Sequence, residues 1–371
     1  MGAKRRRPSV LTIGGALIDT IAVIGNRSIE RMSMTNADRA FLLLEQGSKT
    51  EAEIVSTHPG GGALNAAVSF ARLGFDAATH IKISDDDRGK AVRDRLSEEG
   101  ISAEFVASTT EAPTGASVLI SAHDRDAAIF TFRGANTLLN EGELQPKAFQ
   151  RDVVYVSGLS DGSADCFPAI STLAKKAGAF LATNPGIRQL TTRGDAFEKS
   201  LPHIDLLSMN VDESQALLPR LSERTQKYIS GNKGNLNQRL PSLLQRGLAS
   251  GSFSMSLPHF LSTLVGLGTR CVLLTDGKRG AFAAVNGEIT YCPALKIDTV
   301  GTAGAGDAFS STFTAFLASG SSVGEALQAA TVNAGSVVKF ADTQTGLLTR
   351  RNLEQVLADV KAELPLQVSK L

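Results

Sequence analysis

Cysteine is scarce in this chain, with Cys166, Cys271 and Cys292 the only three among 371 residues. They are odd in number, far apart in the sequence and without the paired spacing of a zinc or redox site. The sequence therefore predicts neither a disulfide framework nor a cysteine metal centre. It fits a reducing, cytoplasmic compartment.

Long apolar runs and an excess of one charge are also lacking. No stretch approaches the ~18 apolar residues of a membrane-spanning helix. The basic start MGAKRRRPS is not followed by an apolar segment of signal-peptide length. The 38 basic and 37 acidic residues are interleaved along the chain. We therefore expect a soluble protein that binds neither membranes nor nucleic acid.

A third absence concerns nucleotide binding. The sequence contains no G-x-x-x-x-G-K-[ST] loop, because TDGKRG at 275–280 lacks both the upstream glycine and the hydroxyl residue. An ordinary P-loop phosphotransferase is therefore excluded.

The sequence does contain short β-branched runs that alternate with stretches of helical periodicity. These runs predict strands at 9–15, 152–158, 179–183, 204–210 and 270–277. Apolar spacing and a closing glycine predict a helix over 86–100. The alternation indicates an α/β fold, with a mainly parallel central sheet covered by helices on both faces.

Three regions depart from this alternation. Residues 17–57 and 104–134 contain strand-like pieces, the second reading as a hairpin about HDRD, and predict a small β-sheet that could act as a lid. Residues 221–257 are polar and rich in Gly, Ser and Asn. We interpret 221–257 as a long insertion, part helix and part mobile loop.

The stretch GTAGAGDAF at 301–309 predicts the start of a helix. It follows YCPALKIDTV, which reads as a strand, and precedes phenylalanines at helical spacing. Unpaired N–H groups at such a start, flanked by very small side chains, can hold an anion. The carboxylate of Asp307 could then accept a proton beside the bound anion. On this stretch alone, a Gly-rich turn with Asp307 as a capping acid is an alternative.

Two other motifs could bind hydroxyl groups. In HPGGGALNAA at 58–67, the glycines permit close approach of a ligand, and Asn65 offers both a donor and an acceptor. GGALID at 14–19 ends on Asp19, whose carboxylate could accept hydrogen bonds from two hydroxyls. The alternatives are a tight turn before a helix for Asn65 and a solvated turn acid for Asp19.

In this order, GGALID, PGGGALNAA, NVDE (210–213), TDGKRG and GAGDAF resemble the ribokinase-like, or PfkB, family of carbohydrate kinases. The correspondence runs from about Val10 to Gly346. The resemblance implies a three-layer α/β/α sandwich, formed as a single domain over 1–371. A small β-sheet lid, at about 17–57 and 104–134, would cover a sugar-binding cleft. It also implies ATP and Mg²⁺ as cofactors.

The resemblance implies a role for each matching position. Asp307 would be the general base, with the anion hole formed by Gly304, Ala305 and Gly306. The acceptor would be bound by Asp19, Gly60, Gly61, Asn65 and Asn136. The nucleotide side would be formed by Asn184, Asn210, Glu213, Thr275, Gly277, Gly280 and Asn333. Glu213 would reach the magnesium ion indirectly, through water.

Two positions depart from the family pattern. Members commonly have Asp six residues before the base, where it supports a monovalent-cation site, but this chain has Gly301, with Asp298 three residues earlier. A monovalent cation is therefore not expected as a firm requirement. The residue after Gly61 is lysine in ribokinase and Gly62 here, which removes one direct sugar contact.

The leading expectation is ATP-dependent phosphorylation of a hydroxymethyl group on a sugar or sugar derivative. The alternatives are an adenosine-like nucleoside kinase on the same fold and a catalytically silent binding or scaffold relative. The retained Asp307 and GAGD argue against the silent relative. The partner is thus a small-molecule sugar or nucleoside, and a homodimer through the lid is compatible with the family. The sequence does not identify the acceptor.

Overall fold

The computed structural model describes residues 6–25, 30–33, 40–43, 47, 49–122, 128–224 and 241–371. Within these ranges a ten-stranded central sheet has the order β18-β17-β16-β15-β12-β11-β10-β1-β6-β7. Its strands are β1 Ser9–Gly14, β6 Asp76–Ser84, β7 Ala107–Thr109, β10 Val153–Val156, β11 Phe180–Thr183, β12 Leu206–Asn210, β15 Cys271–Thr275, β16 Ala281–Val285, β17 Glu288–Cys292 and β18 Gln367–Lys370.

The strands from β15 to β7 run parallel, whereas β16, β17 and β18 extend the sheet antiparallel. The five strands predicted from β-branched runs are β1, β10, β11, β12 and β15, so these predictions are confirmed. The helix predicted over 86–100 is α2 (Asp87–Glu98), capped by the side chain of Asp86.

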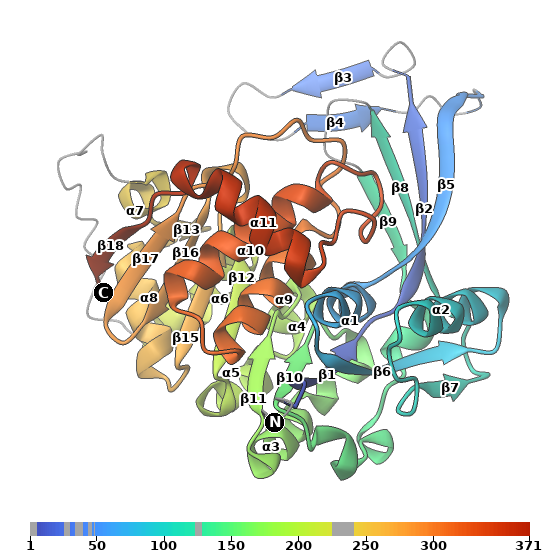
Figure 1. Cartoon of the computed structure of the whole chain (residues 1–371), viewed down its shortest axis with the longest axis horizontal. Coiled ribbons are helices and arrows are strands. Elements are labelled where there is room, and N and C mark those ends of the chain that lie inside the picture. The colour runs from blue at the N-terminus through green and yellow to red at the C-terminus, as the bar shows by residue number, and fades with distance from the viewer. Residues whose placement is uncertain are drawn as a thin grey trace, which may run out of the picture.

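Helices cover both faces of this sheet, giving three layers (Figure 1). Side chains alternate along each strand, so Val10 and Tyr155 join one core while Leu11 and Val154 join the other. The first core lies under α1 (Gly62–Arg72), α9 (Ala305–Ala318), α10 (Val323–Val337) and α11 (Arg350–Val360). The second lies under α3 (Phe167–Ala177), α4 (Ile187–Thr192), α5 (Gly194–Ser200), α6 (Val211–Arg224), α7 (Ser242–Arg246) and α8 (Leu257–Gly266).

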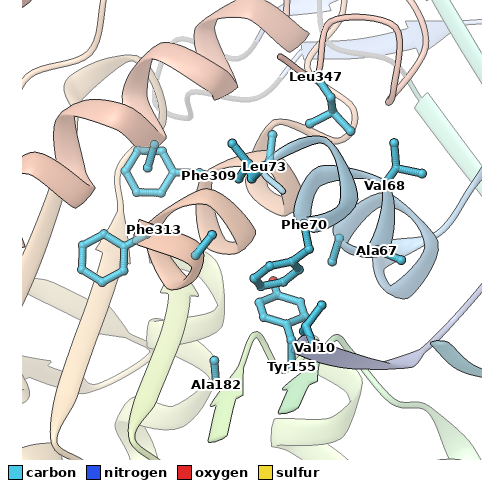
Figure 2. Close-up of a cluster of buried hydrophobic side chains, with 14 of the residues drawn as sticks. Val10, Ala67, Val68, Phe70, Leu73, Tyr155, Ala182, Phe309, Phe313 and Leu347 are labelled. Atoms are coloured by element: carbon cyan, nitrogen blue, oxygen red, sulfur yellow. The ribbon is translucent and has the colours of Figure 1, made fainter. Parts of the chain in front are cut away.

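Aromatic side chains fix α1 against the sheet in the first core. The rings of Phe70 on α1 and Tyr155 on β10 meet edge to face, with centroids 5.6 Å apart (Figure 2). Phe313, from α9, is fully buried in the same cluster. This packing holds the N-terminal ends of α1 and α9 beside each other, where the motifs containing Asn65 and Asp307 lie.

A second, four-stranded sheet of order β5-β2-β8-β9 stands away from the central sheet (Figure 1). It consists of β2 Leu17–Ile24, β5 Ala52–Gly60, β8 Gly115–Ala122 and β9 Ala128–Phe132, with a separate hairpin of β3 Glu30–Ser33 and β4 Ala40–Leu43. Strands β8 and β9 pair antiparallel, as the sequence predicts, although the HDRD turn lies outside the described residues. The predicted lid segment 104–134 begins too early, because β7 pairs with β6 in the central sheet.

The insertion at 221–257 is folded at both ends. Helix α6 continues to Arg224, and after the undescribed 225–240 the chain forms α7 and a hairpin of β13 (Leu248–Ser250) and β14 (Phe253–Met255). Leu243, Leu248 and Met255 are buried in the second core. The C-terminal part of this insertion is therefore an integral part of the domain, and the predicted loop lies within the undescribed residues.

The strand predicted at 291–300 is wrong beyond Cys292, where β17 ends. Pro293 follows immediately, and a proline has no N–H to continue the pairing. Residues 293–299 have no regular structure. Short 3₁₀ turns at 134–137, 141–143, 146–149, 161–166, 201–203, 277–279 and 361–363 complete the described elements. Among the residues described, no helix has both the length and the apolar character needed to cross a membrane.

Candidate active site

The start of α9 has a backbone geometry that can hold an anion. Gly304 precedes the helix in the left-handed conformation, with φ of 77°. The first bond within the helix runs from the Ala308 N–H to the Gly304 carbonyl oxygen, 2.9 Å away. The amides of Gly306 and Asp307 therefore precede the helical ladder and can face a ligand. The amide of Ala305 donates to the Thr302 carbonyl at 3.3 Å, so it is already partly used.

The carboxyl group of Asp307 lies between α9 and α1. The Asn65 Nδ2 atom donates to Asp307 Oδ2 at 2.8 Å. Burial raises the pKa of Asp307, and the bond from Asn65 opposes this by stabilising the ionised form. A Cβ atom on Gly62 would lie only 3.3 Å from Asp307 Oδ1 and 2.9 Å from Ser157 Cβ. The glycine at 62 therefore belongs to the close packing around this carboxylate.

A second carboxylate, Asp19 on β2, lies close enough to Asp307 for their charges to interact. It is buried and accepts a hydrogen bond from the Ser117 hydroxyl on β8. Burial raises the pKa of Asp19, the bond from Ser117 lowers it, and the charge of Asp307 raises it further. A Cβ on Gly60 would overlap the Asp19 carboxylate. The structure thus brings Asp19 and Gly60, both predicted acceptor residues, close to Asp307.

Position 61, just before α1, requires a glycine for two reasons. Its φ is 97°, and a Cβ there would lie 2.7 Å from the Gly15 carbonyl oxygen and 2.8 Å from Ala16 Cα. The turn between β1 and β2 therefore packs directly on the turn before α1.

Asn136 and Asn65, both predicted to bind the phosphate acceptor, form hydrogen bonds to other protein groups. Asn136 accepts from the Ala16 N–H at 3.0 Å and donates to the Ala16 carbonyl at 2.9 Å, so it clamps the β1–β2 turn. The Asn65 oxygen accepts from Thr343 Oγ1 and Gln344 Nε2, each at 2.9 Å. Both amides therefore help to hold the site together, and their contact with the acceptor stays a prediction.

Glu213, at the start of α6, is a third carboxyl group with an elevated pKa. Glu213 caps α6 by accepting from the Asn210 N–H at 2.8 Å, and Asn184 Nδ2 donates to it at 3.4 Å. Burial raises the pKa of Glu213 to about 7, against the lowering effect of these bonds. Asn184 also donates to the Ser208 carbonyl at 3.0 Å. The three predicted residues Asn184, Asn210 and Glu213 therefore form one cluster.

This cluster suits a magnesium ion held through water. The described residues contain no group of three or more His, Cys, Asp or Glu side chains placed to hold a metal. Mg²⁺ keeps several of its waters and is commonly bound by one or two carboxylates together with substrate phosphates. Glu213 matches that pattern, because it supplies a single carboxylate on the nucleotide side.

A cavity of about 770 Å³ opens beside the start of α9. Five predicted residues line it: Thr275, Gly277, Gly280, Ala305 and Gly306. The segment 293–299 and the α10 residues Thr331, Ala334 and Gly335 form other walls. Its size suits a nucleotide-sized ligand.

Asn333, which the resemblance places on the nucleotide side, does not line this cavity. Its side chain is fully buried, donating to Thr312 Oγ1 at 2.8 Å and accepting from the Leu348 N–H at 2.9 Å. The helical period explains this placement, because Asn333 faces the core whereas its neighbours Ala334 and Gly335 face the cavity.

Sequence reasoning missed the ion cluster that supports one cavity wall. Asp276, with a side chain only 2% exposed, accepts from Arg246 at 3.0 Å and from Arg279 at 2.7 Å. Arg246 is the last residue of α7, within the insertion at 221–257. The loop 277–280 that lines the cavity is therefore tied to the insertion. TDGKRG alone gives no signal for this link, since Arg246 lies 30 residues earlier.

Gly301, at the position where the family commonly has aspartate, lies close to backbone carbonyl groups. A Cβ on Gly301 would lie 3.1 Å from the Phe340 carbonyl oxygen and 3.3 Å from that of Ala341. Asp298 is exposed on the preceding segment.

The sequence model of the pfkB family carbohydrate kinases matches residues 19–246 and 257–350. The chain belongs to this family. Asp19, Asn65, Glu213 and Asp307 lie within the matched ranges. The β1–β2 turn precedes these ranges, and the hairpin β13–β14 falls in the gap between them. The protein is accordingly an ATP-dependent carbohydrate kinase.

Individual pfkB relatives agree with this assignment. The chain is 26% identical to a fructokinase of Klebsiella pneumoniae over 256 residues, covering 68% of this chain and 74% of the relative. It is 23% identical to the ribokinase of Bacillus subtilis over 345 residues, covering 91% and 99%.

Solved structures share the fold. Arabidopsis thaliana ribokinase, complexed with ribose and ATP, matches with a TM-score of 0.69 at 19% identity, covering 95% of this chain and 99% of the other. An E. coli protein solved with ATP and Mg²⁺ matches with a TM-score of 0.71 at 16% identity, again covering 95% and 99%.

Proposed function

We propose that this pfkB-family kinase transfers the γ-phosphoryl group of ATP to a hydroxymethyl group of a sugar or sugar derivative. Asp307 acts as the general base, and the N-terminal amides of α9 stabilise the transferred group. The single observation that carries this proposal is the position of Asp307. Its carboxylate lies at a helix start where the Gly306 and Asp307 amides precede the helical bonds. Its charge interacts with that of Asp19, and its neighbours Ala305 and Gly306 line a nucleotide-sized cavity.

The acceptor is bound on the Asp19 side of Asp307. Asp19 is a buried carboxylate that, among the described residues, accepts a side-chain hydrogen bond from Ser117, so it retains acceptor capacity for substrate hydroxyls. Gly60 brings backbone close to that carboxylate, and Gly61 lets the β1–β2 turn pack beside it, both without side chains of their own. The acceptor hydroxyl then lies beside Asp307, which takes its proton as the oxygen attacks phosphorus.

ATP occupies the cavity with its triphosphate directed toward the start of α9. Ala305 and Gly306 line both the cavity and the helix start, so they place the terminal phosphate there. Glu213 would hold magnesium through water, and the bound ion would supply positive charge that neutralises the phosphates. Glu213 and Asp307 interact through their charges, which fits a site that gathers several anions around one cation.

The small sheet closes over the acceptor and serves as a dimer interface. Exposed apolar side chains on its strands include Val55, Val118, Phe130 and Phe132. An apolar surface of this kind on one sheet is typical of an interaction site. Sedimentation of the protein should therefore give a dimer, and Phe130→Asp should give a monomer. A monomeric wild-type protein would refute this assembly.

A substrate panel tests the proposed reaction. The protein, with ATP and Mg²⁺, is offered hexoses, pentoses, their phosphates and nucleosides, and ADP release is measured against a reaction without acceptor. We expect turnover with a sugar or sugar derivative that carries a free hydroxymethyl group. Turnover with nucleosides alone would reassign the acceptor side, and turnover with none of the acceptors would contradict kinase activity.

A further inference from the structure

The side-chain amide of Asn65 is held from three directions. Its Nδ2 atom lies 2.8 Å from Asp307 Oδ2, while its Oδ1 atom lies 2.9 Å from both Thr343 Oγ1 and Gln344 Nε2. The residue is buried in the first turn of α1. If the amide were reversed, its oxygen would face the oxygen of an ionised Asp307, which is repulsive. The direction of this amide therefore decides whether Asp307 receives a hydrogen bond.

Gln344 connects Asn65 to a group that can only donate. The Arg95 Nε–H on α2 donates to Gln344 Oε1 at 2.8 Å. Arg95 is itself held by Glu98 at 3.1 Å and by Glu99 at 3.0 Å. Arg72 also donates to the Gln344 backbone carbonyl at 2.8 Å. The Gln344 side chain is thus buried and fixed at its far end by a guanidinium group.

A guanidinium has no acceptor and does not lose its proton in proteins. Arg95 therefore requires the oxygen of the Gln344 amide, which directs the Gln344 NH₂ group toward Asn65. That NH₂ group in turn requires the oxygen of the Asn65 amide, which directs the Asn65 NH₂ group toward Asp307. We propose that Arg95 and Gln344 are positioning residues that set the direction of the Asn65 amide, so that its N–H group faces the Asp307 carboxylate.

Thr343 contacts the same oxygen but cannot set this direction. Its hydroxyl rotates and can either donate or accept, so it would satisfy Asn65 in both orientations. Thr343 and Gln344 therefore differ in what their replacement does. Replacing Thr343 removes one hydrogen bond to Asn65. Replacing Gln344 by a group that can only accept reverses the direction of the hydrogen bonds that link Gln344, Asn65 and Asp307.

This inference rests on the proposed role of Asp307 as the base. A base must be ionised to accept a proton, and a donated hydrogen bond favours the ionised carboxylate. The titratable groups whose charges interact with Asp307 are Asp19 on β2, Glu213 on α6 and Tyr155 on β10. All three oppose its ionisation when they carry negative charge. The Asn65 N–H group is the side-chain donor that counteracts burial of Asp307.

The pH dependence of turnover tests the proposal, with the acceptor that the substrate panel selects. In Gln344→Glu, the introduced carboxylate keeps the bond from Arg95, which holds it ionised, but it can only accept from Asn65. The Asn65 amide then reverses. We expect the acidic limb of the kcat profile to move up by about one pH unit, since one pH unit corresponds to a tenfold change in the ionised fraction. Turnover should recover at high pH, and KM for ATP should not change.

Matched variants separate direction from packing. Gln344→Met keeps the volume without imposing a direction, so its shift should be smaller than that of Gln344→Glu. Arg95→Met should also shift the acidic limb upward, because it frees the Gln344 amide. Arg93→Met on the same helix should leave the profile unchanged, since Arg93 contacts Ser108 instead. The Arg95 and Arg93 pair decides the question if the Gln344 variants do not fold.

Two results would overturn the proposal. One is an acidic limb that stays in place in Gln344→Glu or Arg95→Met, and the other is an equal shift in Gln344→Met and Gln344→Glu. Asp307→Asn distinguishes these failures from failure of the proposed function. If Asp307→Asn is inactive while the Gln344 variants show a wild-type profile, only the positioning role is wrong. If Asp307→Asn keeps wild-type turnover, the base itself is wrong.

Discussion

Thr343 packs directly against the backbone of Gly304, so that a Cβ atom on Gly304 would lie 2.7 Å from Thr343 Cβ. This contact joins the loop after α10 to the start of α9, three positions before Asp307. It also explains the glycine at 304 by two independent constraints, a left-handed φ of 77° and the absence of room for a side chain.

Gly304→Ala should therefore lower both stability and turnover. The left-handed conformation alone costs about 1–2 kcal/mol for a residue with a Cβ, and the contact with Thr343 must also be relieved by moving the helix start. We expect a lower thermal midpoint and a kcat reduced by roughly tenfold or more, since small misplacements of catalytic groups are costly.

Gly74→Ala is the matched control for Gly304→Ala. Gly74 has φ of 92° but nothing within 4 Å of its added Cβ, so this variant isolates backbone strain. It should lower the thermal midpoint while leaving kcat unchanged. Equal kcat values in Gly304→Ala and wild type would show that the Thr343 contact does not position the site.

The raised pKa of Glu213 predicts how the free energy of unfolding depends on pH. Its pKa is about 7 in the folded protein and 4.5 as an ordinary glutamate, so between these values the folded state binds more protons than the unfolded state. The free energy of unfolding should therefore fall as pH rises through this window, by at most about 3 kcal/mol from this group. The raised pKa values of Asp19 and Asp307 act in the same direction.

Urea unfolding at pH 5 and pH 7, without nucleotide or magnesium, measures this dependence. Glu213→Gln cannot ionise, so its stability should change less between the two pH values than that of the wild type. An identical pH dependence in both proteins would remove Glu213 as a source of the effect.

Replacing Arg246 should weaken the binding of ATP more than that of the acceptor. Arg246→Met leaves the buried Asp276 with Arg279 as its remaining arginine partner, which loosens the loop 277–280 on the cavity wall. We expect KM for ATP to rise several-fold while KM for the acceptor stays constant, because uniform binding of one substrate is weakened. Arg270→Met removes an exposed ion pair to Asp205 and should change neither constant. A rise in KM for the acceptor alone would show that the cavity binds the acceptor and not ATP.

The glycine at position 301, in place of the family's aspartate, predicts that turnover is activated little more by potassium than by sodium. A cation site lined by backbone carbonyls, without a carboxylate, should hold potassium less well. Turnover with potassium and with sodium, at matched ionic strength, should therefore be similar. Activation of several-fold by potassium that is lost in Asp298→Ala would mean that the exposed Asp298 carboxylate enters the site.

The main layers of the fold could be predicted from local patterns. The runs that became β1, β10, β11, β12 and β15 are apolar because strands of a parallel sheet are buried on both faces. The segment after Pro293 misled this reasoning, because its apolar residues line a cavity instead of joining the sheet. Hydrophobicity alone does not distinguish a buried strand from the wall of a binding site.

The motifs identified the carboxylates, but they could not identify the groups that hold them. Asn65 and Gln344 are 279 positions apart, and their contact depends on how the loop after α10 packs against α1. The same limit applies to Asn333 and Asn136, whose residue type suits a ligand contact but whose partners are protein atoms. Residue type indicates what a side chain can bind, whereas tertiary packing decides what it does bind.

Turnover of Asp307→Asn tests the central claim most directly. The amide keeps the shape of the side chain but cannot accept the proton of the acceptor hydroxyl. With the acceptor selected by the substrate panel, kcat should fall by roughly 10²–10⁴-fold, the usual contribution of a positioned base, while ATP still binds with similar affinity. A kcat within a few-fold of wild type would contradict the assignment of Asp307 as the general base.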